Sequence, residues 1–122
     1  MTETEFWMFL KRTVDSNGQM DMVAGSIDSN NSRVSAEGRY INGHSVLFNG
    51  HDKLPDDKVE GLGHLLFDHS ASARSKEAIL MILAHHPTKR ALDILCLYNM
   101  NPDNELRFFA ETALWECKMW NE

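Results

Sequence analysis

Apolar residues recur at helical spacing over residues 56–120, and this periodicity constrains the fold more than any other feature of the chain. Residues that return every three or four positions line one face of a helix. Three short signals divide the stretch into separate helices. Ser72 can cap a helix, Pro87 must end one, and Asn101-Pro102 separates the last two. The sequence therefore predicts four consecutive helices, the last of which runs from Pro102 to about Trp120.

The predicted helices also repeat. A shift of 31 residues aligns Lys76 with Arg107, and the same shift superposes apolar core positions of one helix on those of another. The aligned pairs are Ile79 with Ala110, Ile82 with Ala113, and Leu83 with Leu114. Repetition of helical hairpins at a fixed period is typical of solenoid proteins.

The segment Asn101–Leu114 reads NPDNELRFFAETAL and resembles the short HEAT-like repeats of the bilin-lyase type, whose usual form is close to DPDPEVRRAAAEAL. Asn101 stands where the family prefers Asp. Seven positions agree with the family pattern: Pro102, Asp103, Glu105, Arg107, Ala110, Ala113 and Leu114. Upstream, Ala91 and Leu95 occupy the Ala and Leu positions of a repeat's second helix. The resemblance covers residues 56–120, leaves residues 19–50 without a counterpart, and implies an α-solenoid fragment that binds proteins.

The first half of the chain carries weaker signals. Thr2 and Glu5 fit a capping box, so a first helix is expected from Glu3 to Asp15. All seven glycines lie between residues 18 and 63. Asn42-Gly43 is a preferred two-residue hairpin turn, which predicts a small β-hairpin with arms at 39–41 and 45–48, and a further strand is expected around residues 20–27. The expected architecture is a mainly α single domain over 1–122: an N-terminal helix (1–18), a loop or hairpin segment (19–55) and helical repeats (56–122).

Composition excludes several classes of protein. The net charge is -6, and Arg74 and Lys76 are predicted to lie on solvated surface far from Lys89-Arg90, so no nucleic-acid partner is expected. The longest apolar run, 78–84, is far shorter than the roughly 20 residues of a membrane span. Cys96 and Cys117 fall at apolar helical positions that we expect to be packed, and no charged-then-apolar leader precedes the first helix. These features predict a reduced, cytoplasmic protein.

No catalytic, cofactor or metal site is predicted. Of the six histidines, His64 and His69 are five residues apart rather than four, and the adjacent His85 and His86 should point apart. The sequence has no His-Glu dipeptide of the kind that binds metal in HEAT-repeat di-iron hydroxylases. It also lacks a phosphate-binding glycine loop and a Gly-x-Ser-x-Gly turn. We therefore expect a protein that is not an enzyme.

The last predicted helix has two apolar faces. Its wide core face consists of Leu106, Phe109, Ala110, Ala113, Leu114, Cys117 and Trp120. Its second face carries Phe108, Trp115 and Met119. Two interpretations of this second face remain open: the first helix, with Phe6, Trp7 and Phe9, or the hairpin folds back to cover it, or it binds a protein partner or a second copy of the chain.

The sequence thus predicts a small HEAT-repeat protein-protein interaction module or adaptor whose partner is another protein or a second copy of the chain. Its predicted partner-binding residues are Phe108, Trp115, Met119 and Trp7. The alternative, from a different class, is an inhibitor or immunity-type protein that neutralises a basic enzyme, suggested by small size and acidic charge. A bilin-lyase-like enzyme or a chaperone is a further alternative, drawn from the resemblance alone.

Overall fold

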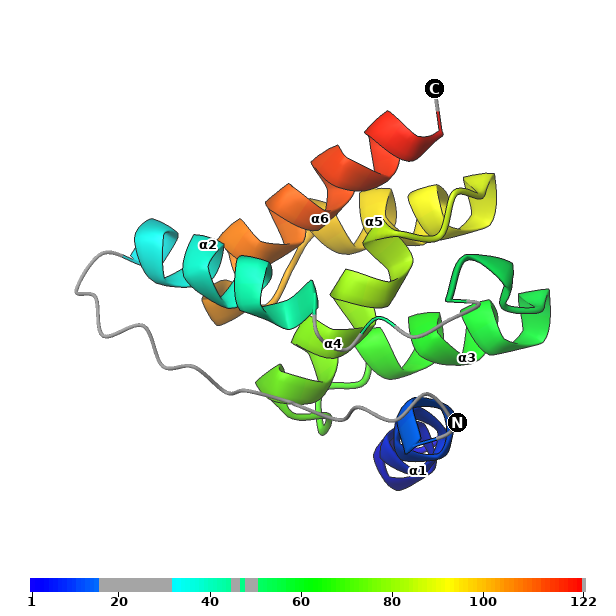
Figure 1. Ribbon diagram of the computed structural model, residues 1–122. Helices are drawn as coiled ribbons and strands as arrows, with labels where there is room; N and C mark the ends of the chain where they lie inside the picture. Colours follow the sequence, from blue (N-terminus) through cyan, green and yellow to red (C-terminus); the bar gives the residue numbers. More distant parts are fainter. Residues whose placement is uncertain (16–31, 45–46, 48–50, 122) are drawn as a thin grey trace.

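The computed structural model describes residues 1–15, 32–44, 47 and 51–121, and these residues form helices and connecting turns without a strand. The elements are α1 (Glu3–Asp15), α2 (Ser32–Gly43), η2 (His51–Lys53), α3 (Asp56–Leu66), α4 (Ala73–Ala84), α5 (Lys89–Met100), η3 (Asn104–Leu106) and α6 (Arg107–Trp120). The predicted mainly α fold class is therefore confirmed. Figure 1 shows α4 in the middle of the molecule, with α1 on one side and α6 on the other.

Helix α4 is the centre of the core. Every residue from Ala78 to Ala84 is at most 5% exposed, so the second half of this helix is apolar around its whole circumference and not along one stripe only. Such a helix needs neighbours on all sides. It packs against α2, α3, α5, α6 and η3. As predicted, Ser72 caps it, because the Ser72 side chain accepts a hydrogen bond from the backbone N–H of Ser75.

Helices α3 to α6 pack as two hairpins in contact with each other. Helix α3 packs on α4 and α5 on α6, and across the hairpins α3 packs on α5 and α4 on α6. The contact between α3 and α5 is close at Gly63, where an added Cβ would stand 3.1 Å from Cδ1 of Ile94. Glycine at this position lets the two helices approach.

Helix α1 begins and ends as predicted. The capping box is present: the backbone N–H of Glu5 donates to Oγ1 of Thr2, and the N–H of Thr2 donates to Oε1 of Glu5. Phe6 and Leu10, one turn apart, are fully buried. Glu3 accepts hydrogen bonds from the backbone N–H and the hydroxyl of Ser72 at 3.0 and 2.6 Å, so α1 is tied to the start of α4.

The predicted β-hairpin around Asn42-Gly43 is wrong, because its first arm lies inside α2. Ala36 and Tyr40, four residues apart, are 3% and 5% exposed, and they bury one side of this helix. Gly43 is its last residue, so the Asn-Gly pair ends a helix instead of turning a hairpin. The expected strand at 20–27 and most of the expected second arm at 45–48 lie outside the described residues.

The start of the last helix also differs from the prediction. Pro102 and Asp103 precede the helix, residues 104–106 form the single 3-10 turn η3, and α6 begins at Arg107. Asp103 is extended, with ψ at 135°. Its carboxylate accepts hydrogen bonds from Lys76 and from the hydroxyl of Tyr98, and these contacts hold it outside the helix.

Five residues of the predicted core face, namely Leu106, Phe109, Ala110, Ala113 and Cys117, are at most 1% exposed. Leu114 is only partly buried. Trp120 is 55% exposed, so its predicted place in the core is wrong. Among the described helices, none combines the length and apolar character required to cross a membrane.

Candidate functional site

The outer face of α6, which we define as Trp115 and Met119, is an apolar surface that the rest of the described chain leaves exposed, as it does Trp120 at the end of the same helix. Trp115 is 64% and Met119 45% exposed. They are four residues apart, so they lie one above the other on the same side of the helix. The structure thus places two of the four predicted partner-binding residues together on one open face.

Phe108, predicted to belong to the same face, is partly covered. The Arg33 guanidinium of α2 lies 4.4 Å from the centre of the Phe108 ring, and the Arg107 guanidinium lies 5.2 Å from it. Both distances fall within the range of cation–π contacts. Phe108 therefore lies at the border between α2 and α6 and not among the open side chains.

Trp7, the fourth predicted residue, lies elsewhere. Its Nε1–H donates to Oγ of Ser75 at 2.8 Å, and its ring lies edge-on to Phe6 and 5.6 Å from the Arg74 guanidinium. These contacts place Trp7 between α1 and α4. The structure does not bring it together with Trp115 and Met119.

Helix α2, and not α1 or a hairpin, packs beside the second face of α6. Tyr40 lies edge-on to Phe109 with ring centres 5.0 Å apart, and Arg33 pairs with Glu111 at 3.8 Å. The covering segment does come from the region predicted to form the hairpin, but as a helix. It covers the Phe108 end of α6 and leaves Trp115 and Met119 exposed.

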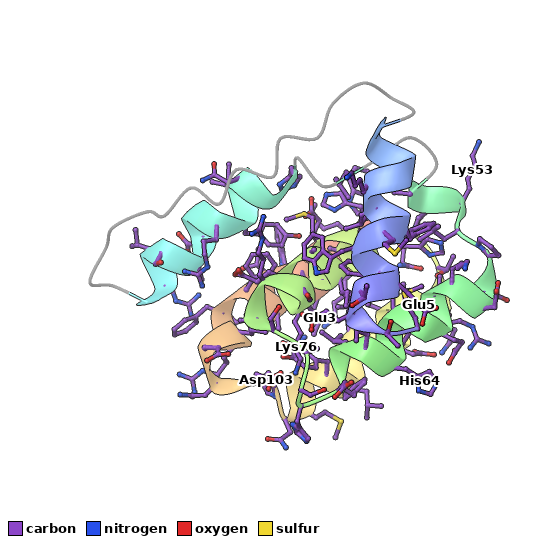
Figure 2. All side chains as sticks on the ribbon, turned by 90° about the horizontal axis from the view of Figure 1, so that it is seen from below. Glu3, Glu5, Lys53, His64, Lys76 and Asp103 are labelled. Atoms are coloured by element: carbon purple, nitrogen blue, oxygen red, sulfur yellow. The ribbon has the colours of Figure 1, made fainter. Side chains whose placement is uncertain are left out.

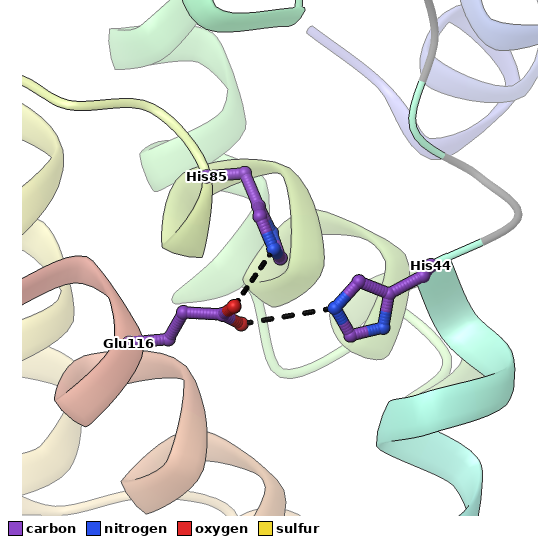
Figure 3. A group of neighbouring side chains, drawn as sticks. All are labelled: His44, His85 and Glu116. Carbon is purple, nitrogen blue, oxygen red and sulfur yellow. Dashed lines mark ion pairs between the residues drawn. The ribbon is translucent and has the colours of Figure 1, made fainter. Parts of the chain in front are cut away.

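A second cluster lies on the other flank of α6 and was not predicted. His44 follows α2, His85 ends α4, and Glu116 lies on α6 (Figure 3). Nε2 of His85 is 3.0 Å from Oε2 of Glu116, and Nε2 of His44 is 3.9 Å from Oε1. The two imidazole rings have centres 4.8 Å apart. One ligand atom from each residue lies within 4.8 Å of the others, a spacing suited to a shared cation.

Backbone carbonyls fix the orientation of both imidazoles. Nδ1 of His85 is 2.9 Å from the carbonyl oxygen of Met81, and Nδ1 of His44 is 3.0 Å from that of Tyr40. A carbonyl oxygen can only accept a hydrogen bond, so each Nδ1 carries a proton and donates it. In both rings it is therefore Nε2 that faces Glu116.

Tyr40 supports the carboxylate of this cluster. Its hydroxyl donates to Oε1 of Glu116. Burial, together with the hydrogen bond to Glu116 and its negative charge, raises the pKa of Tyr40, which keeps the phenol protonated as a donor. His51 and Trp120 complete the surroundings, with ring centres 6.1 and 6.4 Å from that of His85.

The neighbouring His86 points away from this cluster, as predicted. Its Nδ1 lies 2.9 Å from the Thr88 hydroxyl oxygen and its Nε2 3.4 Å from the carbonyl oxygen of Leu54, and the side chain is 2% exposed. Its own carbonyl accepts a weak hydrogen bond from the Cys117 thiol at 3.8 Å. His86 is thus a core residue that joins the end of α4 to the segment before α3.

The two cysteines differ, although both were predicted to lie on packed faces. Cys117 is fully buried, and burial raises the pKa of its thiol to about 11. Cys96 is exposed, which corrects the prediction for that residue. Both are free thiols.

The residues of the His–Glu cluster are 41 and 31 positions apart in the chain, so a search for ligands spaced along one helix misses them. One signal in the sequence could have found part of the cluster: His85 directly follows the uninterrupted apolar run 78–84, two residues before Pro87. Comparison with known proteins adds no assignment, since no family model, curated protein or solved structure matches the chain.

Proposed function

We propose that this chain is a small protein-binding helical module of HEAT-like type that self-associates through the outer face of α6. The observation that carries the proposal is the exposure of Trp115 and Met119, one turn apart on the helix. Aromatic and Met side chains are enriched at the centres of protein interfaces, and exposed Trp is a frequent anchor. The proposed activity is binding, without catalysis.

The packing of α3 to α6 supports the repeat part of the proposal. Each pair of successive helices forms a hairpin, and the first and second helices of one hairpin pack on the corresponding helices of the next. In a solenoid, each repeat buries its apolar face against neighbours, and a second copy of the chain can take the place of a neighbour.

The charges beside Trp115 favour a second copy of the chain as the partner. Glu111 and Lys118 lie seven residues apart, two turns along the helix, and share one flank of the Trp115–Met119 face. If two α6 helices pack antiparallel about a two-fold axis near Trp115, Glu111 of each copy, which also pairs with Arg33 of its own chain at 3.8 Å, meets Lys118 of the other. An isologous interface requires this kind of self-complementarity. Two small side-chain clusters form a modest interface, so we expect a dimer in the micromolar range.

Light scattering of the purified chain across a concentration series tests the proposal. The wild type should approach a dimer mass as concentration rises, and Trp115→Asp should remain a monomer with an unchanged helical circular dichroism spectrum. Met8→Asp is a matched control, because Met8 is 55% exposed on α1 and its replacement should leave the dimer intact. A wild-type chain that stays monomeric at every concentration, or a Trp115→Asp chain that still dimerises, refutes the proposed self-association.

The two free thiols favour a reducing compartment, and we propose that the module works in the cytoplasm. Localisation of a tagged chain in cells, by fluorescence or by fractionation, tests this part separately. Recovery of the chain from an oxidising compartment would contradict it.

A further inference from the structure

We propose that His44, His85 and Glu116 bind one Zn²⁺ or a similar late first-row divalent ion, which joins α2, α4 and α6. The proposal concerns a different flank of α6 from the self-association face, and neither depends on the other. It rests on the position and orientation of the three side chains (Figure 3).

Hydrogen bonds to backbone carbonyls orient both imidazoles for metal binding. Each Nδ1–H is committed to a backbone carbonyl, of Met81 for His85 and of Tyr40 for His44. A neutral imidazole held in this way presents the lone pair of Nε2, the usual form of a metal-binding histidine whose other nitrogen donates to a carbonyl. The carboxylate of Glu116 is also only an acceptor when ionised. Three acceptor atoms therefore converge, an arrangement that a cation between them would stabilise.

The separations between the ligand atoms can be compared with those of a tetrahedral Zn²⁺ site. Zn²⁺ binds nitrogen and oxygen ligands at about 2.0–2.1 Å, so two ligands in a tetrahedral site stand about 3.3 Å apart. The separations found here are 3.0 Å between His85 Nε2 and Glu116 Oε2 and 3.9 Å between His44 Nε2 and Glu116 Oε1. One ligand atom from each of the three residues lies within 4.8 Å of the others, so the side chains must draw closer together around an ion. His44 is the exposed member at the end of α2, so a small rotation of its ring can close the wider separation.

The ligand set determines the class of ion. Imidazole suits Zn²⁺, Cu²⁺, Ni²⁺ and Fe²⁺, whereas Mg²⁺ and Ca²⁺ prefer oxygen ligands throughout. Three protein ligands leave a fourth position for water in a tetrahedral site. The hydroxyl of Tyr40 donates to Glu116 and holds the carboxylate in place, as outer hydrogen bonds do at metal sites.

Calorimetric titration of the untagged, chelator-treated full chain with Zn²⁺ tests the proposal. We expect one ion per chain, and loss of about tenfold or more in affinity for His44→Ala, His85→Ala and Glu116→Gln. His64→Ala and His69→Ala are matched controls, because these exposed histidines lie outside the cluster and their removal should leave the affinity unchanged. Mg²⁺ at the same concentration should not compete.

Two further readouts keep the test decisive if a variant folds poorly. Zn²⁺ in excess should raise the melting temperature of the wild type by about 5 °C or more, since an ion that binds only the folded chain stabilises it. Co²⁺ in place of Zn²⁺ should give the strong visible absorption of a four-coordinate site with nitrogen ligands. No Zn²⁺ uptake by the wild type, or uptake that is lost in His64→Ala and His69→Ala and kept in His85→Ala, overturns the assignment.

Discussion

Nζ of Lys76 on α4 lies 2.8 Å from Oδ2 of Asp103 in the turn before η3, and the two side chains are 3% and 29% exposed (Figure 2). Lys76 was predicted to lie on solvated surface, and its burial corrects that prediction. The same carboxylate accepts a hydrogen bond from the hydroxyl of Tyr98 on α5. One acidic side chain thus connects α4, α5 and the start of the last helix.

Removal of Asp103 should cost more than removal of Lys76. Asp103→Ala leaves the buried ammonium group of Lys76 without its partner, and an uncompensated buried charge costs about 3 kcal/mol or more of unfolding free energy. Lys76→Met replaces the buried charge with an apolar side chain of similar length and leaves Asp103 partly in contact with water, so it should cost about 1 kcal/mol or less. Urea unfolding of both variants measures the difference. Equal losses of unfolding free energy in the two variants would contradict the prediction that a buried Lys76 without its partner is the larger cost.

Stability should fall at low pH partly through Asp103. Burial alone would raise the pKa of Asp103, but the hydrogen bonds from Lys76 and Tyr98 and the charge of Lys76 outweigh it, and the net pKa is lowered. A lowered folded-state pKa contributes stability that is present above the unfolded pKa of about 3.9 and is lost as pH falls through the folded value. Asp103→Asn has no such contribution. The wild type should therefore exceed the variant in unfolding free energy by less at pH 3 than at pH 6, measured in urea at each pH.

The two thiols should react at different rates. Cys96 is exposed and should react with a disulfide reagent such as DTNB in the folded chain. Cys117 is fully buried and its thiol pKa is raised to about 11, so it should react only after unfolding. One thiol per chain is expected to react in buffer and two in denaturant. Cys96→Ser should abolish the reaction in buffer, and a remaining fast reaction would contradict the buried place of Cys117.

Tyr40→Phe should weaken Zn²⁺ binding without removing a ligand. The variant keeps the ring that packs on Phe109 and loses only the hydroxyl that donates to Glu116. Loss of such an outer hydrogen bond lowers metal affinity by about 10- to 100-fold. Tyr98→Phe is the matched control, because its hydroxyl donates to Asp103 and not to the cluster. The same loss in both variants would indicate a general loss of structure.

Local signals in the sequence predicted those helices whose start and burial depend on near neighbours. The capping box of Thr2 and Glu5 and the cap at Ser72 each involve residues three positions apart, and both predicted helix starts are confirmed. Helix α2 was missed for a physical reason. It buries chiefly a small residue, Ala36, and Tyr40, so it carries too short an apolar stripe to be recognised, and its burial depends on α6 about 70 residues further along the chain.

The two parts of the candidate site also differ in how far the sequence predicts them. Trp115 and Met119 could be placed on one face from helical spacing alone, because they belong to the same helix. His44, His85 and Glu116 come from three parts of the chain, and α2 had to be known as a helix before His44 could be located. Spacing rules along one helix cannot report on a site of this kind.

Helices α1 and α2 contact residues that are far away in the sequence, and this affects the order in which the helices fold. Glu3 and Ser72 are 69 residues apart, and Tyr40 and Glu116 are 76 apart, whereas the hairpins of α3 to α6 join close neighbours in sequence. Contacts that close long loops form late, because closing a long loop costs more chain entropy than closing a short one. We expect pulse-labelling hydrogen exchange to show the α3–α6 amides protected before those of α2. A nascent or partly unfolded chain would then hold two of the three proposed ligands in place and acquire His44 in its final step.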